Sequence, residues 1–399
     1  MIQIIQILIY VLSAVLLTYL LLSAFYFFFF AVFSKFKYTS PNMAIPAKKV
    51  NVDVLIPSYK EDSVIVETAL SASMHQSIHA NVRVTVIADS LQIETLNELS
   101  ANHIKYIAVS FVKSTKALAL NEALMQLDRD SDYVLVLDAD NLMADNALDE
   151  IVKCINTGYS IVQGHRTAKN ANTDFALLDG LSEEINNSIF RLGHRNVGLS
   201  AALIGSGFIC ETALFKNVME DVKAVGGFDK ELELYLLERK IKIGYAEKAH
   251  FLDEKIQKAD AFVNQRRRWL SAQLVYLGKN STKAIKLLFF KGNLDYFDKT
   301  LQYALPPRIL ALFFPVLMLV FSLSLVMWLQ YSYLFVYLWG MVLILNVFSI
   351  IIAIPKTMWT ITYIKAMMHA PKGFFFMMLA LFKIKDANKS FIHTKHGSI

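Results

Sequence analysis

Residues 133–140 read Tyr133-Val-Leu-Val-Leu-Asp138-Ala-Asp140, an apolar strand that ends in two carboxylates. In an extended chain, a spacing of two residues directs both carboxylates to one side. Open α/β sheets bind ligands beyond the carboxyl ends of their strands, and a hard divalent cation takes oxygen ligands. A DxD pair also occurs in turns and helix caps, so it is the preceding strand that favours a metal site. The stretch predicts that Asp138 and Asp140 hold Mg²⁺ or Mn²⁺ against a diphosphate.

Strand and helix patterns alternate around this stretch, from about residue 50 to residue 280. Strands are predicted at 52–56, 82–88 and 133–137, and helices at 62–74, 93–99 and 116–127, with another after residue 144. This alternation is typical of an α/β domain with a mostly parallel sheet. About 230 residues suffice for one domain with its own core.

Further polar residues lie where the other predicted strands end. Pro57, Tyr59 and Glu61 close the first strand, and Asp89 ends the second. Lys116 begins a predicted helix. Each of these positions is also common at a helix cap, but together they favour a crevice that binds the base and sugar of a nucleotide.

Three charge-free stretches are long enough to cross a membrane, namely residues 1–34, 309–329 and 334–354. A helix of 21 residues measures about 30 Å, the thickness of the hydrocarbon core. The first stretch is too long for the apolar core of a signal peptide. Basic residues flank the spans only at the ends that would lie on the same side of the membrane. They are Lys35, Lys37, Lys48 and Lys49 after the first span, Arg308 before the second and Lys356 after the third. The positive-inside rule therefore places the region between the first two spans in the cytoplasm.

The composition argues against a purely cytosolic enzyme, because 55% of the residues are apolar and only 19% are charged. The formal net charge is +6. Seven lysines against the single Asp386 follow Pro355, so the basic excess lies in the C-terminal segment and indicates contact with a membrane surface, not with nucleic acid. Cys154 and Cys210 lack the spacing of a zinc site or a disulfide framework.

Two later segments combine residue types that suit a sugar nucleotide. Gln265-Arg266-Arg267-Arg268-Trp269 places three guanidinium groups beside an indole, which fits phosphate pairing and sugar stacking. A membrane-interface cluster is the alternative, since Arg and Trp are common there. Gly205-Ser206-Gly207 permits close approach of the backbone to a ligand. It lacks the pattern of a phosphate-binding loop, so a kinase or ATPase is unsupported, and His75 and His79 do not form a zinc-binding HExxH motif.

Together these motifs resemble the family-2 glycosyltransferases of GT-A fold. The resemblance is greatest to the membrane-integrated branch that includes hyaluronan, cellulose and poly-N-acetylglucosamine synthases and ceramide glucosyltransferase. It covers residues 50–280 through five ordered motifs: Pro57 to Glu61, Asp89, Lys116 to Asn121, Asp138 with Asp140, and Gln265 to Trp269. It implies a GT-A-type, Rossmann-like sheet in a cytoplasmic domain, with membrane-spanning and interfacial helices attached.

The resemblance also implies roles for particular residues. Nucleotide-sugar binding is expected of Pro57, Tyr59, Glu61, Asp89, Lys116 and Asp138, and metal binding of Asp140 and Asp138. The acceptor and diphosphate are expected near Gln265, Arg267, Arg268, Trp269, Gly205, Ser206 and Gly207. The divalent metal is expected to be Mg²⁺ or Mn²⁺.

The chain departs from the family where the catalytic base is expected. The family has a TED-type triplet before a helix, whereas this chain reads Gly226-Gly227-Phe228-Asp229-Lys230-Glu231-Leu232. Matching the Leu232-Glu233-Leu234 that follows assigns the base to Glu231, with Asp229 as the second choice. A Glu can act as a general base if it reaches the acceptor hydroxyl. An inactive site is the remaining alternative.

We expect an inverting, metal-dependent transfer of a sugar from a nucleoside diphosphate sugar, a UDP-sugar by analogy with the relatives. The acceptor is a glycan or a membrane lipid, and processive synthesis, a single addition and a non-catalytic nucleotide-sugar-binding protein stay open. Three spans offer little wall for a polymer channel unless subunits oligomerise. The expected location is the plasma or inner membrane.

The sequence divides into five expected parts. They are a transmembrane helix (1–34), a GT-A glycosyltransferase domain (50–280), interfacial helices (281–308), a transmembrane hairpin (309–354) and a basic interfacial segment (355–399). Within the last part, residues 373–384 are short, apolar and bracketed by lysines, which favours an interfacial helix over a fourth span.

Overall fold

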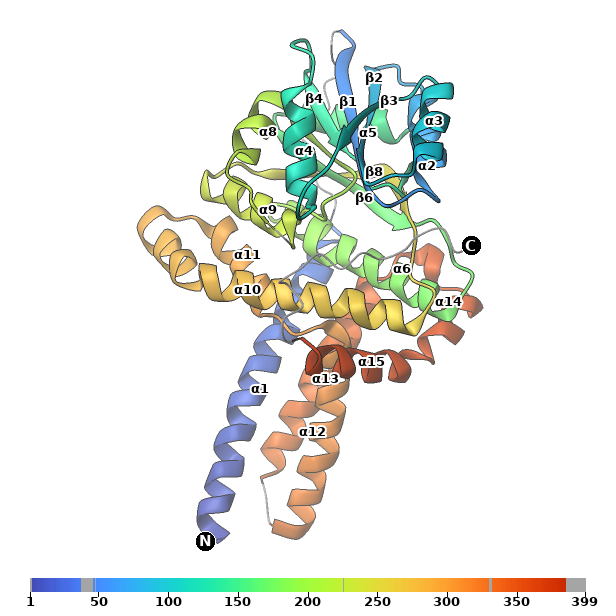
Figure 1. Ribbon diagram of the computed structural model, residues 1–399. Helices are drawn as coiled ribbons and strands as arrows, with labels where there is room; N and C mark the ends of the chain where they lie inside the picture. Colours follow the sequence, from blue (N-terminus) through green and yellow to red (C-terminus); the bar gives the residue numbers. More distant parts are fainter. Residues whose placement is uncertain (1, 37–45, 47, 225, 330–331, 385–399) are drawn as a thin grey trace.

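The computed structural model describes residues 2–36, 46, 48–224, 226–329 and 332–384. A domain built on a β-sheet lies at one end of the molecule, and three long helices extend from the other (Figure 1). Helices α10 and α15 lie crosswise between them (Figure 1). Lys37 and residues 385–399, which belong to the predicted basic flanks, lie outside the described residues.

The sheet has eight strands in the order β3-β2-β1-β4-β7-β6-β8-β5. Their bounds are β1 Val50–Tyr59, β2 Ala80–Asp89, β3 Lys105–Val109, β4 Tyr133–Val136, β5 Leu142–Met143, β6 Ile161–Ala168, β7 Phe208–Glu211 and β8 Ile243–Asp253. Strands β1 to β4 are parallel, and Val52 lies opposite both Val82 and Tyr133. Strand β7 runs antiparallel to β4 and β6. The predicted mostly parallel sheet is therefore confirmed.

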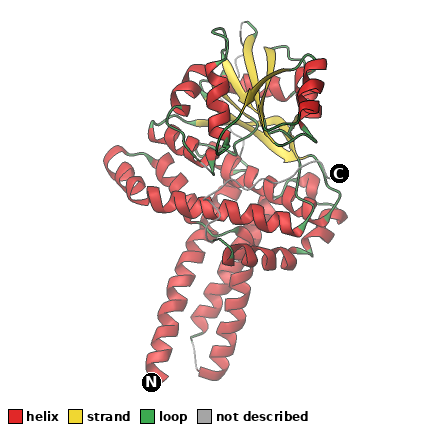
Figure 2. Ribbon diagram, in the orientation of Figure 1, coloured by secondary structure: helices red, strands yellow, loops and turns green. Residues whose placement is uncertain are grey.

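Helices cover both faces of the sheet. Successive side chains of a strand point to opposite faces, and in these strands the side chains on both faces are apolar. In β1, Val54 and Ile56 belong to one buried cluster, whereas Leu55 belongs to the other. The first cluster includes residues of α2 (Ile65–Ser73), α3 (Ile93–Ala101) and α5 (Ala147–Ile155). The second includes α4 (Lys116–Met125), α8 (Thr212–Met219) and α9 (Phe228–Glu238). Helices and strands thus form three layers (Figure 2).

A second group of helices connects the sheet domain to the long helices. Helix α6 (Asp174–Asn186) continues through a π-helix (Asn187–Gly193) into α7 (His194–Asn196). The 33-residue α10 (Ala259–Lys291) forms a hairpin with α11 (Leu294–Ala304). Gly292 ends α10 with φ of +59°, a left-handed conformation that glycine adopts without strain.

Helices α1 (Ile2–Phe33), α12 (Arg308–Leu329) and α13 (Tyr333–Ala353) are the three long apolar helices. Within the described residues, Ile7–Phe33, Arg308–Met327 and Tyr333–Ala353 are long and apolar enough to span a membrane. They pack through Leu20, Trp339 and Val342. A 3-10 turn (Lys356–Met358), α14 (Ile361–Met367) and the apolar α15 (Ala370–Phe382) follow.

Candidate active site

Lys116 connects two parts of the predicted site. Its ammonium group forms an ion pair with Asp138, just beyond the end of β4, and donates a hydrogen bond of 2.7 Å to the carbonyl oxygen of Gly205. Lys116 is the first residue of α4, and the Thr115 hydroxyl caps this helix by accepting from the N–H of Leu118. The DxD motif and the Gly205–Gly207 loop therefore meet at one side chain.

Asn141 orients both acids of the motif. Its side-chain amide, which is fully buried, donates to Asp140 at 3.2 Å and to Asp253 at 2.9 Å. Its amide oxygen accepts from the hydroxyl of Ser206, and this hydroxyl accepts from the backbone N–H of Asp138 at 2.9 Å. Asp140 itself is 6% exposed. The network holds the carboxylate of Asp140 and the backbone of Asp138, whereas the carboxylate of Asp138 is held by Lys116.

A buried glutamine holds the Gly205–Gly207 loop through hydrogen bonds to its backbone. The side-chain amide of Gln163, on β6, donates to the carbonyl oxygens of Ser206 (2.9 Å) and Gly207 (3.1 Å). Its oxygen accepts from the N–H of Ile204 at 3.1 Å. Gly207 has φ of +62°, and a Cβ there would lie 2.8 Å from the ring of Phe251, so only glycine fits.

The residues expected to bind the nucleotide lie at the same edge of the sheet. Tyr59 and Asp89 are paired at the ends of β1 and β2, and Asp89 is buried, with a hydrogen bond from Ser90. Pro57 lies in β1 opposite Ile87. The backbone oxygen of Glu61 accepts the first hydrogen bonds of α2. The structure thus gathers the ends of β1, β2 and β4 with the start of α4.

Asp229 and Glu231 point in different directions from α9. The Cβ of Asp229 would lie 3.5 Å from a Cβ placed on Gly205, so Asp229 borders the loop that Lys116 holds. Glu231 instead accepts a hydrogen bond of 3.1 Å from the backbone N–H of Lys223, before α9. Two positions apart on a helix lie on nearly opposite faces. The structure therefore brings Asp229, and not Glu231, to the Gly205–Gly207 loop.

The two carboxyl groups also differ in electrostatic environment. Burial raises the pKa of Asp229, but the ammonium groups of Lys230 and Lys299 outweigh it and hold this pKa below its ordinary value. Burial raises the pKa of Glu231 above its ordinary value, against the backbone N–H groups of Lys223 and Ala224. The ionised form, which is the form that can accept a proton, is therefore stabilised more strongly at Asp229 than at Glu231.

The Gln265–Trp269 segment lies in the first third of the crosswise helix α10. The guanidinium of Arg266 forms an ion pair with Asp179 of α6 and lies 4.4 Å from the ring centre of Trp269. Gln265, Arg267 and Arg268 are partly buried, and Trp269 is 38% exposed. This segment is thus fixed to α6 while its indole stays accessible.

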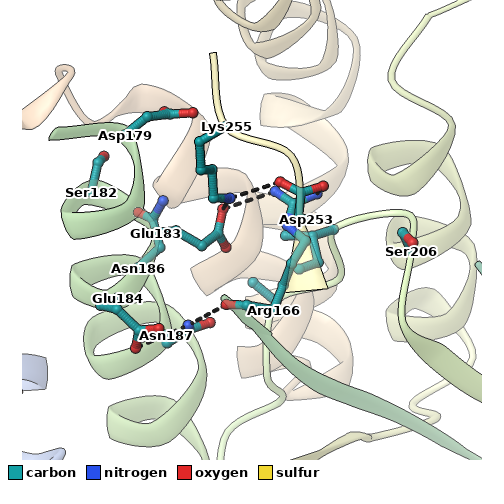
Figure 3. Close-up of polar contacts among 12 residues, drawn as sticks. Arg166, Asp179, Ser182, Glu183, Glu184, Asn186, Asn187, Ser206, Asp253 and Lys255 are labelled. Carbon is teal, nitrogen blue, oxygen red and sulfur yellow. Dashed lines mark hydrogen bonds and ion pairs between the residues drawn. The ribbon is translucent and has the colours of Figure 1, made fainter. Parts of the chain in front are cut away.

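A buried charged cluster, which no sequence pattern predicted, joins α6 to residues Arg166, Asp253 and Lys255 (Figure 3). Glu183 pairs with Arg166 at 2.8 Å and with Arg191 at 3.1 Å, and Lys255 pairs with Asp253 at 2.7 Å. Burial raises the pKa of Glu183, but these cations reverse the effect and hold it well below its ordinary value. Since Asp253 also accepts from Asn141, the cluster reaches the carboxylate pair.

The donor set fits a divalent metal whose coordination is completed by a ligand. Among the residues that the structure describes, no group of three or more His, Cys, Asp or Glu side chains gathers to enclose an ion. Asp138 and Asp140 carry hard oxygen atoms of the kind that Mg²⁺ and Mn²⁺ take as ligands. The open positions suit the oxygens of a diphosphate and water.

The sequence of residues 49–272, more than half of the chain, matches the family described as glycosyltransferase like family 2. The protein is therefore a member of glycosyltransferase family 2, and the expectation of an enzyme of this class is confirmed. No sequence among curated proteins shows a significant match.

Among solved structures, the chain resembles a mannosyltransferase from Pyrobaculum calidifontis in complex with GDP-Man and Mn²⁺, with 14% identity and a TM-score of 0.50 over 86% of this chain and 96% of that one. It also matches glucosyl-3-phosphoglycerate synthase from Mycobacterium tuberculosis, in complex with Mn²⁺, UDP and glucosyl-3-phosphoglycerate, with 14% identity and a TM-score of 0.35 over 56% and 78%. The first similarity confirms the GT-A fold.

Proposed function

We propose that the protein transfers a sugar from a UDP-sugar to a hydroxyl group at the cytoplasmic face of a membrane, with inversion at the anomeric carbon. Asp140 and Asp138 would hold Mn²⁺ or Mg²⁺, which when bound neutralises charge on the leaving diphosphate. Lys116 adds a second positive charge beside Asp138. Pro57, Tyr59, Glu61 and Asp89 would bind the nucleoside.

One observation carries this proposal. Lys116 contacts Asp138 of the donor motif and the carbonyl of Gly205, and Asp229 also borders Gly205. A sugar held by its diphosphate at Asp138 would therefore have a carboxylate close to it. This is the arrangement that in-line attack by an activated hydroxyl requires.

Of the acidic residues on α9, we assign the general base to Asp229. Glu231 faces the loop before the helix, where it accepts a backbone hydrogen bond. Glu233 is 2% exposed and forms an ion pair with Lys299. Asp229 alone combines partial exposure of its side chain (25%) with a position beside Gly205.

The acceptor would approach from the membrane side of the domain. Gln265, Arg267 and Arg268 lie on α10, between the sheet domain and the spans, and Trp269 offers a stacking surface for a sugar ring. Two acceptors fit: a membrane lipid that receives one sugar, and a growing glycan. The three candidate spans among the described residues favour the lipid, because export of a polymer through three helices would need an oligomer.

The test is UDP release by the full-length protein in liposomes, with and without Mn²⁺, across a panel of UDP-sugars and with GDP-mannose as a further donor. We expect metal-dependent release with one donor. Asp229→Asn should abolish this release, whereas Glu231→Gln should retain it. Retained activity in Asp229→Asn with loss in Glu231→Gln would reverse our assignment of the base. The size of the radiolabelled product distinguishes a single addition from a polymer.

A further inference from the structure

A buried ion pair joins α9 to α11 close to the proposed base. The Nζ atom of Lys299 lies 2.7 Å from Oε2 of Glu233, and the two side chains are 9% and 2% exposed. The other carboxylate oxygen of Glu233 accepts from the backbone N–H of Leu203 at 3.3 Å. This pair therefore connects α11, α9 and the segment that leads into the Gly205–Gly207 loop.

Glu233 lies one helical turn after Asp229, so the two carboxylates share a face of α9. Lys230, on the same helix, lies 3.5 Å from Asp229. The other titratable groups that interact electrostatically with Asp229 come from neighbouring helices: Tyr276 on α10, and Lys299 and Tyr303 on α11. Lys299 thus supplies positive charge to Asp229 from a separate element.

Helix α11 is itself anchored to a membrane-spanning helix. Asp298, the neighbour of Lys299, accepts hydrogen bonds from the hydroxyl of Tyr26 on α1 (2.7 Å) and from the side chain of Gln302 (2.9 Å). It also lies 3.2 Å from the ring of His194, which is fully buried. These contacts hold α11 in place, so the ammonium group of Lys299 has a fixed position.

We propose that Lys299 is a positioning residue for the sugar transfer: through Glu233 it fixes the face of α9 that carries Asp229, and it supplies the positive charge that faces the Asp229 carboxylate from α11. The inference rests on the proposed function and on Asp229 as its base. Lys299 acts through these two carboxylates and does not itself contact a substrate.

The experiment is the pH dependence of kcat/KM for UDP release by the full-length protein in liposomes. Asp229 must be ionised to accept a proton, so activity is lost as the pH falls through its pKa. Removing an opposite charge raises a carboxyl pKa, and we expect the acidic limb of Lys299→Met to move up by about one pH unit. Activity should recover above this limb, and Lys299→Arg should keep the original profile.

Two further variants sharpen the result. Burial raises the pKa of Glu233 above its ordinary value, so Glu233 is already neutral in the lower pH range in which Asp229 titrates. The acidic limb of Glu233→Gln should therefore stay close to that of the unsubstituted protein, in contrast to Lys299→Met. Lys283→Met is the matched control, because Lys283 pairs with Glu238 of the same α9 at 2.6 Å on the exposed side of the helix. Its profile should equal that of the unsubstituted protein.

The inference is overturned if the acidic limb of Lys299→Met coincides with that of Lys283→Met. A uniform loss of activity at every pH would also overturn it, because that is the signature of a purely structural role. Failure of the proposed function is a different result: the unsubstituted protein would release no UDP in a metal-dependent manner. The two failures are therefore distinguishable.

Discussion

The carboxylate of Asp140 is nearly buried and receives a hydrogen bond from Asn141, which restrains its orientation. Asp140→Asn keeps the size of the side chain and removes its charge. We expect metal-dependent UDP release to fall by a factor on the order of 10² or more, because charge stabilisation of this kind is worth several kcal/mol. A titration with Mn²⁺ measures this effect.

The control for this change is Asp149→Asn. Asp149 also accepts hydrogen bonds, including one of 3.2 Å from the N–H of His79, but it lies on α5, outside the site. The rate of UDP release by Asp149→Asn should stay close to that of the unsubstituted protein. Equal activity of both variants would remove Asp140 from the metal site.

Gln163 is expected to stabilise the Gly205–Gly207 loop, since its amide serves two carbonyls and one N–H of the backbone. Gln163→Leu removes the side-chain partner of the Ser206 carbonyl and the Ile204 N–H, whereas the Gly207 carbonyl keeps a hydrogen bond from the N–H of Gly164; the expected cost is about 1–3 kcal/mol. Chemical unfolding of the protein in detergent measures the loss. Gln126→Leu, at an exposed glutamine after α4, should unfold like the unsubstituted protein, and identical midpoints for both variants would contradict the role of Gln163.

At the level of single residues, the sequence predicts the DxD pair because an apolar strand leads directly into it. It does not predict which acid of α9 faces the loop. The rotation of this helix is set by the burial of Leu232 and Leu236 against residues distant in the chain. Likewise, nothing near Gln163 indicates that its partners follow some 40 residues later.

Helix α6 has a polar face that is buried. The charged cluster on this face makes the stability of the folded protein depend on pH. The pKa of Glu183 is depressed in the folded protein, so its ion pairs contribute stability above the pKa of an unfolded Glu, about 4.3, and lose it as the pH falls towards the folded pKa. Glu183→Gln leaves Arg166, Arg191 and Lys255 with too little negative charge. We expect a loss of about 3–5 kcal/mol at pH 7.

The measurement is chemical unfolding at pH 7 and near pH 4. The difference in free energy of unfolding between Glu183→Gln and the unsubstituted protein should be smaller at the lower pH, because the ion pairs of Glu183 begin to lose their stabilising effect there. Glu98→Gln, at an exposed position of α3, serves as the control. A constant difference at both pH values would show that the ionisation of Glu183 does not contribute.

Among the elements, those whose own residues carry the full hydrophobic pattern can be predicted from the sequence. Strands β1, β2 and β4 are apolar runs because they are buried on both faces, and each is close to its predicted position. From the sequence alone, the polar residues of α6 would be assigned to a solvent-exposed face. Their partners Arg166 and Lys255 belong to other parts of the chain, so the sequence of α6 does not indicate its burial. The π-helix that follows α6 has no sequence signature.

For the whole molecule, the arrangement in the membrane makes a topological prediction. With the sheet domain in the cytoplasm, the turn between α12 and α13 lies on the opposite side. In intact cells, Ser332→Cys should react with a membrane-impermeant thiol reagent, whereas Glu94→Cys on α3 should react only after lysis; both positions are exposed. Labelling of Glu94→Cys in intact cells would reverse the orientation and separate the site from cytosolic sugar nucleotides.

The long apolar stretches are the most predictable part of the whole molecule, because the thickness of a bilayer sets their length. Their attachment to the sheet domain is not predictable in the same way. It depends on single polar contacts between distant segments, such as the hydrogen bonds from Arg308 to Ser182 and Asn186 and from Asn196 to the backbone of Phe33.

The hydrogen bond from Tyr26 to Asp298 joins residues 272 positions apart. A ribosome adds about 5–20 residues per second, so on the order of 15–50 seconds pass between the synthesis of these two residues. Throughout this interval Tyr26 lacks the partner that joins α1 to α11. The junction is therefore closed late, once α11 has been made, and the helix that carries the proposed base gains this support before α12 and α13 have been synthesised.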